Sequence, residues 1–382
     1  MKKGYTMTWK KKREAFIKMK QCMKKIIILM VAVAWMLTTL SGCARTNHVL
    51  DGSQIVAQVG EDSIPLGVVN FYIRMRQAQI EPAYTTWFGM TAEELWEAEV
   101  EAGVTFGQSL RMELLGELEN LYILRQQAES FGVSLDAEQM AAMEAVVDQF
   151  LANNEEDALA VVSGERAYIM TILELSTISR LMSDAIRATA SPNFTTEDAL
   201  QKYMEFVVFP FVGTDAEGTP IELTAGEIEL LRMTAQEFAT TVRSIEGYDM
   251  ALAAAEFGVE VHSISFDEES FFAPWEVLSA AWNLSTEGEV SGVIEAEDGF
   301  YVVKLLSLYD EEATAERLTE LEEDYKQEFF FSTIEQWREE TQMNRFLTVL
   351  EQIDLGGLGI IPYEPAITLE PEEDTEPIED EE

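Results

Sequence analysis

Few side chains of this 382-residue chain could perform acid–base or nucleophilic chemistry. Its two histidines are His48, near the N-terminus, and His262, in an apolar run typical of a strand. We interpret His262 as an ordinary strand or surface histidine. Tyr301 could donate a hydrogen bond to a carbonyl group, but a phenol with a pKa near ~10 is a poor base at neutral pH. On residue types alone, no acid–base pair is evident.

The signatures of other site chemistries are missing from the sequence. It has no His/Cys cluster with metal-ligand spacing, no G-x-S-x-G elbow and no Walker-type phosphate loop. A glycine cluster at 356–359 lies in a linker and is no dinucleotide fingerprint. Adjacent acids on helices, such as Glu322-Glu323 and Glu339-Glu340, are interpreted as solvated faces. We therefore predict no metal site and no cofactor.

The first residues combine positive charge with an apolar run. Lys24-Lys25 precede the run over 26–40, which is short for a transmembrane helix and suits a signal sequence. The run ends in Leu40-Ser41-Gly42-Cys43, which resembles a bacterial lipobox, in which the cysteine becomes the lipidated first residue after cleavage. We expect residues 1–42 to be a lipoprotein signal segment, Cys43 the lipidation site and 43–53 a polar tether.

This resemblance implies a lipid anchor at the outer face of the bacterial cytoplasmic membrane. The alternative is an uncleaved membrane anchor with a chance cysteine. Translation could also start at Met23 in place of Met1. Removal of Cys22 and lipidation of Cys43 would leave no thiol for a disulfide, a zinc site or a nucleophile, so export would require no oxidising chemistry.

The charge of the chain is strongly negative. Ten of its 26 basic residues and one of its 70 acidic residues precede Cys43, so the remainder carries 16 basic and 69 acidic residues, a formal net charge of −53. Binding to a phosphate backbone depends on Lys and Arg, so a nucleic-acid partner is disfavoured. An anionic membrane surface would also repel this charge. Membrane attachment is therefore expected only through the lipid.

The stretch Glu287–Leu306 has the pattern of a β-hairpin. A Gly-Glu-Val-Ser turn at 288–291 leads into a short apolar run, an acidic turn follows at 297–299, and a β-branched and aromatic strand ends the stretch. Two β segments joined by a glycine-bearing turn are typical of a hairpin. Just before it, Trp275–Asn283 spaces its apolar residues like one face of a short helix.

This helix and hairpin resemble the C-terminal half of a parvulin-type peptidyl-prolyl isomerase domain. In that family a helix ending in AAF precedes L…GEVS.PV, and GYHIIKL closes the sheet. The matching residues here are Ala280-Ala281-Trp282, Leu284, Gly288-Glu289-Val290-Ser291 and Gly299-Phe300-Tyr301-Val302-Val303-Lys304-Leu305. The resemblance implies a small parvulin-like α/β domain over 201–311.

A parvulin-type isomerase site needs particular residues around the proline of its substrate. Prolyl isomerisation has a barrier near ~20 kcal/mol and is slow enough to limit folding. In the parvulin family an apolar pocket holds the proline ring, while two imidazoles and a Cys or Asp surround the twisting amide. Here Phe209, or alternatively Val208, stands at the first His position and Tyr301 at the second. The GG.LG.F segment of the family is replaced by 264–272. No catalytic residue is therefore carried over, and isomerase activity is left open.

An altered aromatic pocket could persist without the two imidazoles. The candidate proline-pocket or peptide-binding residues are Phe209, Phe211, Trp282, Phe300 and Tyr301. Trp282 stands at the aromatic position of the family. The alternative interpretation is that these aromatic side chains are simply core.

The regions on either side of this domain have helical patterns. A strand–turn–strand is predicted over 54–66, and apolar residues at helical spacing follow. Together with Ala128–Gln139 (AESFGVSLDAEQ), this region resembles the SurA N-terminal or PrsA-type foldase family, with a generic helical bundle as the alternative. The resemblance implies a helical domain over 54–200, on which a C-terminal helix over 312–355 packs back.

The predicted fold class is therefore α+β: a mainly helical chaperone domain with an inserted small parvulin-like α/β domain. Residues 356–382 are expected to be a linker and an acidic tail that cannot bury enough apolar surface to fold. The resemblance implies a membrane-anchored extracytoplasmic foldase or chaperone with weak or lost isomerase activity. Its partners would be unfolded or partly folded secreted polypeptides, and a homodimer is left open.

Two alternative functions remain at this point. The first is an active peptidyl-prolyl cis–trans isomerase with a non-standard site. The second is a non-catalytic envelope scaffold lipoprotein with one defined protein partner. A solute-binding lipoprotein is disfavoured because the repeated α/β pattern of such folds is absent from the sequence.

Overall fold

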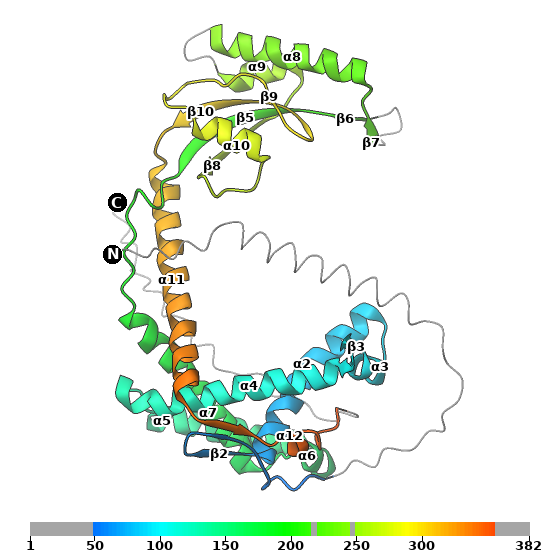
Figure 1. Cartoon of the computed structure of the whole chain (residues 1–382), viewed down its shortest axis with the longest axis vertical. Helices are drawn as coiled ribbons and strands as arrows, with labels where there is room; N and C mark the ends of the chain where they lie inside the picture. The colour runs from blue at the N-terminus through cyan, green and yellow to red at the C-terminus, as the bar shows by residue number, and fades with distance from the viewer. Residues whose placement is uncertain (1–48, 215–219, 245–248, 356–382) are drawn as a thin grey trace, which may run out of the picture. The chain divides into compact units, whose positions relative to one another are not determined.

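The computed structural model describes residues 49–214, 220–244 and 249–355 (Figure 1). Helices predominate over strands in these residues, which confirms the predicted α+β, mainly helical fold class. The expected signal segment, the lipidation site Cys43 and the acidic tail lie outside the described residues.

Contacts within the chain divide it into two compact units. The second unit is Ile186–Ser332, and the first contains the residues before and after it. The domain predicted over 201–311 lies inside the second unit. The second unit extends further on both sides, because it includes the end of helix α7 (Arg166–Thr189) and most of helix α11 (Glu311–Glu340).

The first unit contains a three-stranded antiparallel sheet with the strand order β11-β1-β2. Strands β1 (Ile55–Val59) and β2 (Asp62–Pro65) form the hairpin predicted over 54–66. Gly60, with a φ of +57°, makes the turn between them, a conformation that favours glycine. Strand β11 (Met343–Arg345) pairs with the other edge of β1.

The C-terminal helix predicted over 312–355 is interrupted. Helix α11 ends at Glu340, and β11 and the short helix α12 (Leu347–Leu350) follow. The backbone leaves the helix to pair with β1, where Phe346 donates its N–H to the carbonyl of Val56 at 2.7 Å. The edge of β1 thus satisfies backbone groups that a continuing helix would have satisfied internally. The apolar spacing of the sequence could not show that pairing with β1 would replace the continuing helix.

Helices pack around the sheet of the first unit. They are α2 (Leu66–Phe88), α3 (Ala92–Glu97), α4 (Phe106–Gln127), α5 (Ala137–Asn153), α6 (Glu156–Val162) and the first part of α7, with the 3-10 turn η1 (Ala128–Phe131) and the hairpin β3 (Glu99–Glu101)–β4 (Val104–Thr105). Capping boxes begin α3, α4 and α5 at Thr91, Thr105 and Asp136. Each capping box satisfies backbone N–H groups that the first turn of a helix leaves free.

A buried carboxylate joins the two stretches of the first unit. Glu119, in α4, is 0% exposed and accepts hydrogen bonds from Arg338 Nη2 at 2.5 Å and Arg345 Nε at 2.6 Å. Arg338 Nη1 also donates to Asn120 Oδ1 at 2.7 Å. A buried charge is costly unless it is paired and hydrogen-bonded. These contacts therefore fix the end of α11 and strand β11 to α4.

The second unit is a four-stranded antiparallel sheet with the order β8-β5-β10-β9. Its strands are β5 (Lys202–Pro210), β8 (Val261–Phe266), β9 (Ile294–Glu295) and β10 (Gly299–Ser307), and a hairpin of β6 (Val212–Thr214) and β7 (Pro220–Glu222) follows β5. Helices α8 (Ala225–Ser244) and α9 (Met250–Phe257) cover one face of the sheet, and α10 (Trp275–Trp282) covers the other (Figure 1). The pairing of β9 with β10 confirms the hairpin predicted over 287–306.

Candidate functional site

The register of β5 against β10 decides which side chains share a face of the sheet. Phe209 lies opposite Phe300, and Val208 lies opposite Tyr301. Successive side chains of a strand point to opposite faces, so Phe209 and Phe300 belong to the core under α8 and α9, while Val208 and Tyr301 pack with α10. Of the two residues considered at the first His position, Val208 is therefore the one that faces Tyr301.

The five candidate pocket residues do not form one cluster. Phe209 and Phe300 are buried under α8 and α9, and Phe211 packs edge-on against Phe300 with ring centroids 4.9 Å apart. Tyr301 and Trp282 lie on the opposite face, in the core under α10. The sheet separates the two groups, so a single pocket cannot contain all five side chains.

An aromatic row lies on the α10 face of the sheet. Phe206 stands between His262 and Tyr301, with ring centroids 5.2 Å and 6.2 Å away. Sequence reasoning missed Phe206, because its place depends on the pairing of β5 with both β8 and β10. The row is the one place among the described residues where an imidazole and a phenol share a surface of the second unit.

Tyr301 is held as a hydrogen-bond donor in this row. Its side chain is 5% exposed, and its hydroxyl donates to Asp298 Oδ2 at 2.8 Å. Burial, followed by the hydrogen bond to Asp298, raises the pKa of Tyr301 above the usual value of a phenol. The hydroxyl therefore stays protonated at neutral pH and is already occupied by the carboxylate.

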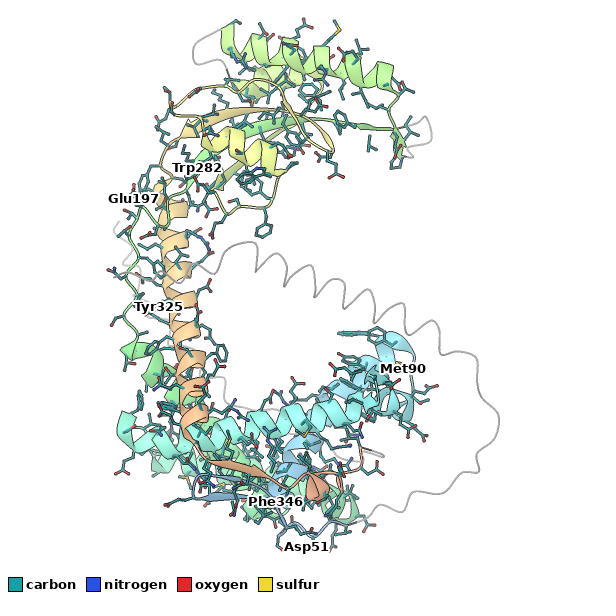
Figure 2. The ribbon with its side chains drawn as sticks, viewed as in Figure 1. Asp51, Met90, Glu197, Trp282, Tyr325 and Phe346 are labelled. Atoms are coloured by element: carbon teal, nitrogen blue, oxygen red, sulfur yellow. The ribbon has the colours of Figure 1, made fainter. Side chains whose placement is uncertain are left out.

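Trp282, labelled in Figure 2, is the last residue of α10. It packs against the buried side chain of Lys202. Lys202 Nζ donates to the carbonyls of Trp282, at 2.6 Å, and Leu284, at 3.0 Å, and lies 4.7 Å from the centroid of the indole ring. Phe266 packs edge-on against the same ring at 6.1 Å. Burial lowers the pKa of Lys202. These contacts give Trp282 a packing role at the end of the helix.

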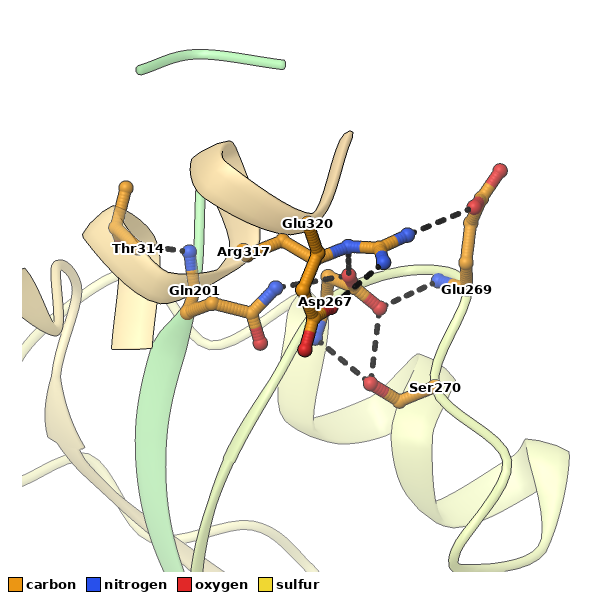
Figure 3. Close-up of polar contacts among 7 residues, drawn as sticks. All are labelled: Gln201, Asp267, Glu269, Ser270, Thr314, Arg317 and Glu320. Carbon is orange, nitrogen blue, oxygen red and sulfur yellow. Dashed lines mark hydrogen bonds and ion pairs between the residues drawn. The ribbon is translucent and has the colours of Figure 1, made fainter. Parts of the chain in front are cut away.

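A polar network fixes the loop at 267–274, here named the Phe271 loop, to its surroundings (Figure 3). Asp267 Oδ1 accepts hydrogen bonds from the Ser270 hydroxyl at 2.8 Å and from the backbone N–H of Glu269 at 2.9 Å. Asp267 Oδ2 accepts from Gln201 Nε2 at 2.8 Å and lies 3.5 Å from Arg317 Nε. The first residues of the loop are thus tied to the start of β5 and to α11.

This loop exposes aromatic side chains. Phe271 is 93% exposed, and Trp275, at the start of α10, is 64% exposed. Phe272 is also exposed. Single exposed apolar residues are ordinary, but several on one ordered segment are typical of a contact surface.

A second aromatic surface lies on the first unit. Four rings follow one another from the core outward: Trp96 stacks on Phe106 at 5.5 Å, Phe106 contacts Tyr84 at 5.9 Å, and Tyr84 contacts Phe88 at 5.6 Å. We name these four residues the aromatic ladder. Trp96 is buried, whereas Phe88 and its neighbour Trp87 are 54% and 77% exposed. Met90, labelled in Figure 2, follows in the turn between α2 and α3.

Sequence reasoning missed the aromatic ladder. Its members occur at helical spacing in α2, near the end of α3 and at the start of α4, where they match the pattern of ordinary core residues. Thr85, Thr86 and Gly89 lie among the aromatic residues near the end of α2. They could have indicated that the helix ends here, outside the core.

The described residues contain no group of three or more His, Cys, Asp or Glu side chains that could hold a metal ion. Across the same residues, no helix is both long and apolar enough to span a bilayer.

Comparison with known proteins gives structural similarity at low sequence identity. No protein-family model and no curated protein matches the chain. One of two related SurA-like chaperones of Campylobacter jejuni is 12% identical with a TM-score of 0.26, covering 76% of this chain and 98% of its own. The foldase protein PrsA of Streptococcus pneumoniae is 15% identical with a TM-score of 0.25, covering 61% and 89%. The peptidylprolyl isomerase PrsA of Bacillus cereus is 14% identical with a TM-score of 0.26, covering 80% and 93%.

Proposed function

We propose that this protein is a membrane-anchored extracytoplasmic foldase of the chaperone type, which holds unfolded or partly folded secreted polypeptides. The lipobox-like sequence ending at Cys43 supports the anchor. A foldase is supported by the helix and hairpin that resemble a parvulin domain. The hairpin belongs to the antiparallel sheet of the second unit, and the helix packs on that sheet.

The observation that carries the proposal is that each unit exposes aromatic side chains on ordered elements. Trp87 and Phe88 extend from α2 in the first unit, and Phe271 and Trp275 extend from the Phe271 loop and α10 in the second. An unfolded polypeptide exposes apolar side chains that a folded protein buries, and aromatic residues supply large contact areas at low entropy cost. The formal net charge of −53 over the residues from Cys43 onward opposes aggregation of a protein with such a surface.

The arrangement of side chains on the α10 face supports the proposal of weak or lost isomerase activity. Val208 lies opposite Tyr301, so neither position that would carry an imidazole in the parvulin family does so. The Tyr301 hydroxyl is buried and bound to Asp298. At these two strand positions a twisting amide would find neither a free acid nor a base.

The test uses the full chain in lipid nanodiscs and one unfolded client that has a slow proline-limited refolding phase. Light scattering reports whether aggregation is suppressed, and fluorescence reports the slow phase. We expect suppressed aggregation with no acceleration of the slow phase. Absence of suppression would overturn the chaperone proposal and favour the scaffold alternative, in which one defined partner binds and unrelated clients do not.

An active isomerase with a non-standard site is the second candidate, and the row of His262, Phe206 and Tyr301 favours it. His262 is exposed and could approach a substrate carbonyl from the edge of the row. Acceleration of the slow phase by the full chain, lost in the His262→Ala variant but kept in a Ser263→Ala control at the next exposed residue of β8, would establish this candidate. No acceleration would exclude it.

A further inference from the structure

The aromatic ladder lies in an acidic part of the chain. Between Arg76 and Arg111 the sequence has six acidic residues and no Lys or Arg. Helix α3 and hairpin β3–β4 contain most of them, and α3 packs against both α2 and α4, which contribute the other ladder residues. The exposed acids are Glu93, Glu94, Glu97, Glu99 and Glu101. An apolar surface is thus bordered by charges of one sign.

The buried end of the ladder is fixed by hydrogen bonds. Trp96 Nε1 donates to Glu81 Oε2 at 2.8 Å, and Gln77 Nε2 donates to the same oxygen at 2.8 Å. Gln77 is fully buried and also donates to the carbonyl of Leu355 at 2.9 Å. The stacked pair of Trp96 and Phe106 therefore has a defined orientation, and the rings further out rest on it. A surface ordered before binding loses less conformational entropy when a ligand binds.

We propose that the aromatic ladder and its acidic border bind extended polypeptide segments that combine aromatic or aliphatic side chains with Lys or Arg. The apolar side chains would pack against Tyr84, Trp87 and Phe88, and the cations would meet the carboxylates. An ammonium or guanidinium group also binds favourably over the face of an indole ring. This inference rests on the proposed function and adds the class of client segment that the first unit selects.

The charge of the border argues against an acidic occupant. The chain's own residues 356–382 contain ten acidic residues and no basic residue, so repulsion disfavours their docking on this surface. A neutral apolar segment would gain the ring contacts but not the ion pairs. Selectivity should therefore follow the order cationic, neutral, acidic among segments of equal apolar content.

The test measures binding of three fluorescent peptides to the full chain in nanodiscs by anisotropy. The peptides have equal length and the same aromatic residues, and their other positions carry Lys, Ser or Glu. We expect the Lys peptide to bind about tenfold more tightly than the Ser peptide at low salt, because several exposed ion pairs each add a little. We expect the Glu peptide to bind most weakly, and added salt to remove the difference.

Two variants separate the apolar from the ionic contribution. The aromatic variant replaces Phe88, the outer residue of the ladder, and its exposed neighbour Trp87 by alanine. It should weaken binding of both the Lys and the Ser peptides by about tenfold, as removal of aromatic anchors does at interfaces. The border variant should weaken binding of the Lys peptide by about fivefold and leave the affinity of the Ser peptide unchanged. Its substitutions are Glu93→Gln, Glu97→Gln and Glu101→Gln. Glu94 is kept because it caps α3 through Thr91.

A charge-matched control removes three exposed carboxylates from other helices of the first unit. Its substitutions are Glu138→Gln and Glu144→Gln in α5 and Glu156→Gln in α6. Equal weakening of the Lys peptide by the control and the border variant would overturn the inference, because net charge would then explain it. If the full chain suppresses client aggregation but all three peptides bind alike, the inference fails and the chaperone function stands. If it neither suppresses aggregation nor binds any peptide, both fail.

Discussion

Tyr301 in β10 lies directly opposite Val208 in β5, and its hydroxyl is taken by Asp298 at 2.8 Å. A bound amide facing these two strand positions would therefore meet the apolar side chain of Val208 and a Tyr301 hydroxyl that is already hydrogen-bonded. The contact between Tyr301 and Asp298 serves the fold, because it ties the turn before β10 to the sheet.

The Tyr301→Phe substitution tests this structural role. We expect it to destabilise the second unit by about 1 kcal/mol, because the carboxylate of Asp298 loses a hydrogen bond. Urea denaturation of the full chain, followed by circular dichroism, measures the change. Holding of unfolded clients should not change. If the variant stays folded but suppresses client aggregation less than wild type does, Tyr301 would instead be assigned to the binding surface.

The Glu119→Gln substitution should destabilise the first unit by about 3 kcal/mol. Loss of the carboxylate leaves Arg338 and Arg345, both less than a third exposed, without their common anion. Denaturation monitored by fluorescence provides the measurement. The exposed pair of Arg166 and Asp148 offers a control, since Asp148→Asn should cost little. Equal effects of the two substitutions would contradict the role given to Glu119.

The Asp267→Ala substitution should loosen the Phe271 loop. Asp267 accepts hydrogen bonds from Ser270, the Glu269 backbone and Gln201, and alanine removes all of them. We expect faster cleavage by chymotrypsin after the exposed Phe271, because the loop would sample conformations that fit a protease. Glu268→Ala, a change at the next residue, is the control and should leave the cleavage rate unaltered. Equal rates in wild type and the Asp267 variant would show that the network does not order the loop.

Asp310 should make the stability of the second unit depend on pH. Its pKa lies below the ordinary value of an aspartate, because the Ser265 hydroxyl and then the Ala313 backbone N–H donate to the carboxylate. A depressed folded-state pKa gives stability that is complete above the unfolded-state pKa and is lost as pH falls through the folded-state value. We expect wild type to lose more stability than Asp310→Asn when the pH falls from about 5 to about 2. Parallel curves for the two proteins would refute this assignment.

Local patterns predicted much of the second unit. The glycine-bearing turn and the alternation of apolar residues identified the hairpin of β9 and β10, and the spacing of Val277, Leu278 and Ala281 identified α10. These features depend on residues that are close together in the sequence, so the local pattern is enough to predict them.

The candidate site could be predicted less well, because it depends on pairing between distant segments. Strands β5 and β10 are about ninety residues apart, and a shift of one residue in their register moves every side chain to the other face. This is why Phe209 was considered beside Tyr301 although it packs under α8 and α9. The aromatic ladder was missed for a related reason: only the packed structure reveals that Trp87 and Phe88 lie beyond the core.

The pairing of β1 with β11 has a consequence for the order in which the chain acquires structure. Ala57 lies opposite Arg345, so the sheet of the first unit cannot close until the chain has been synthesised as far as Arg345. Until then β1 has an unpaired edge, which invites association with other chains. The second unit lies wholly between these two strands in sequence, so all of its residues are present before β11 is made. Its early folding would bring the ends of the first unit closer and reduce the entropy lost when β11 docks.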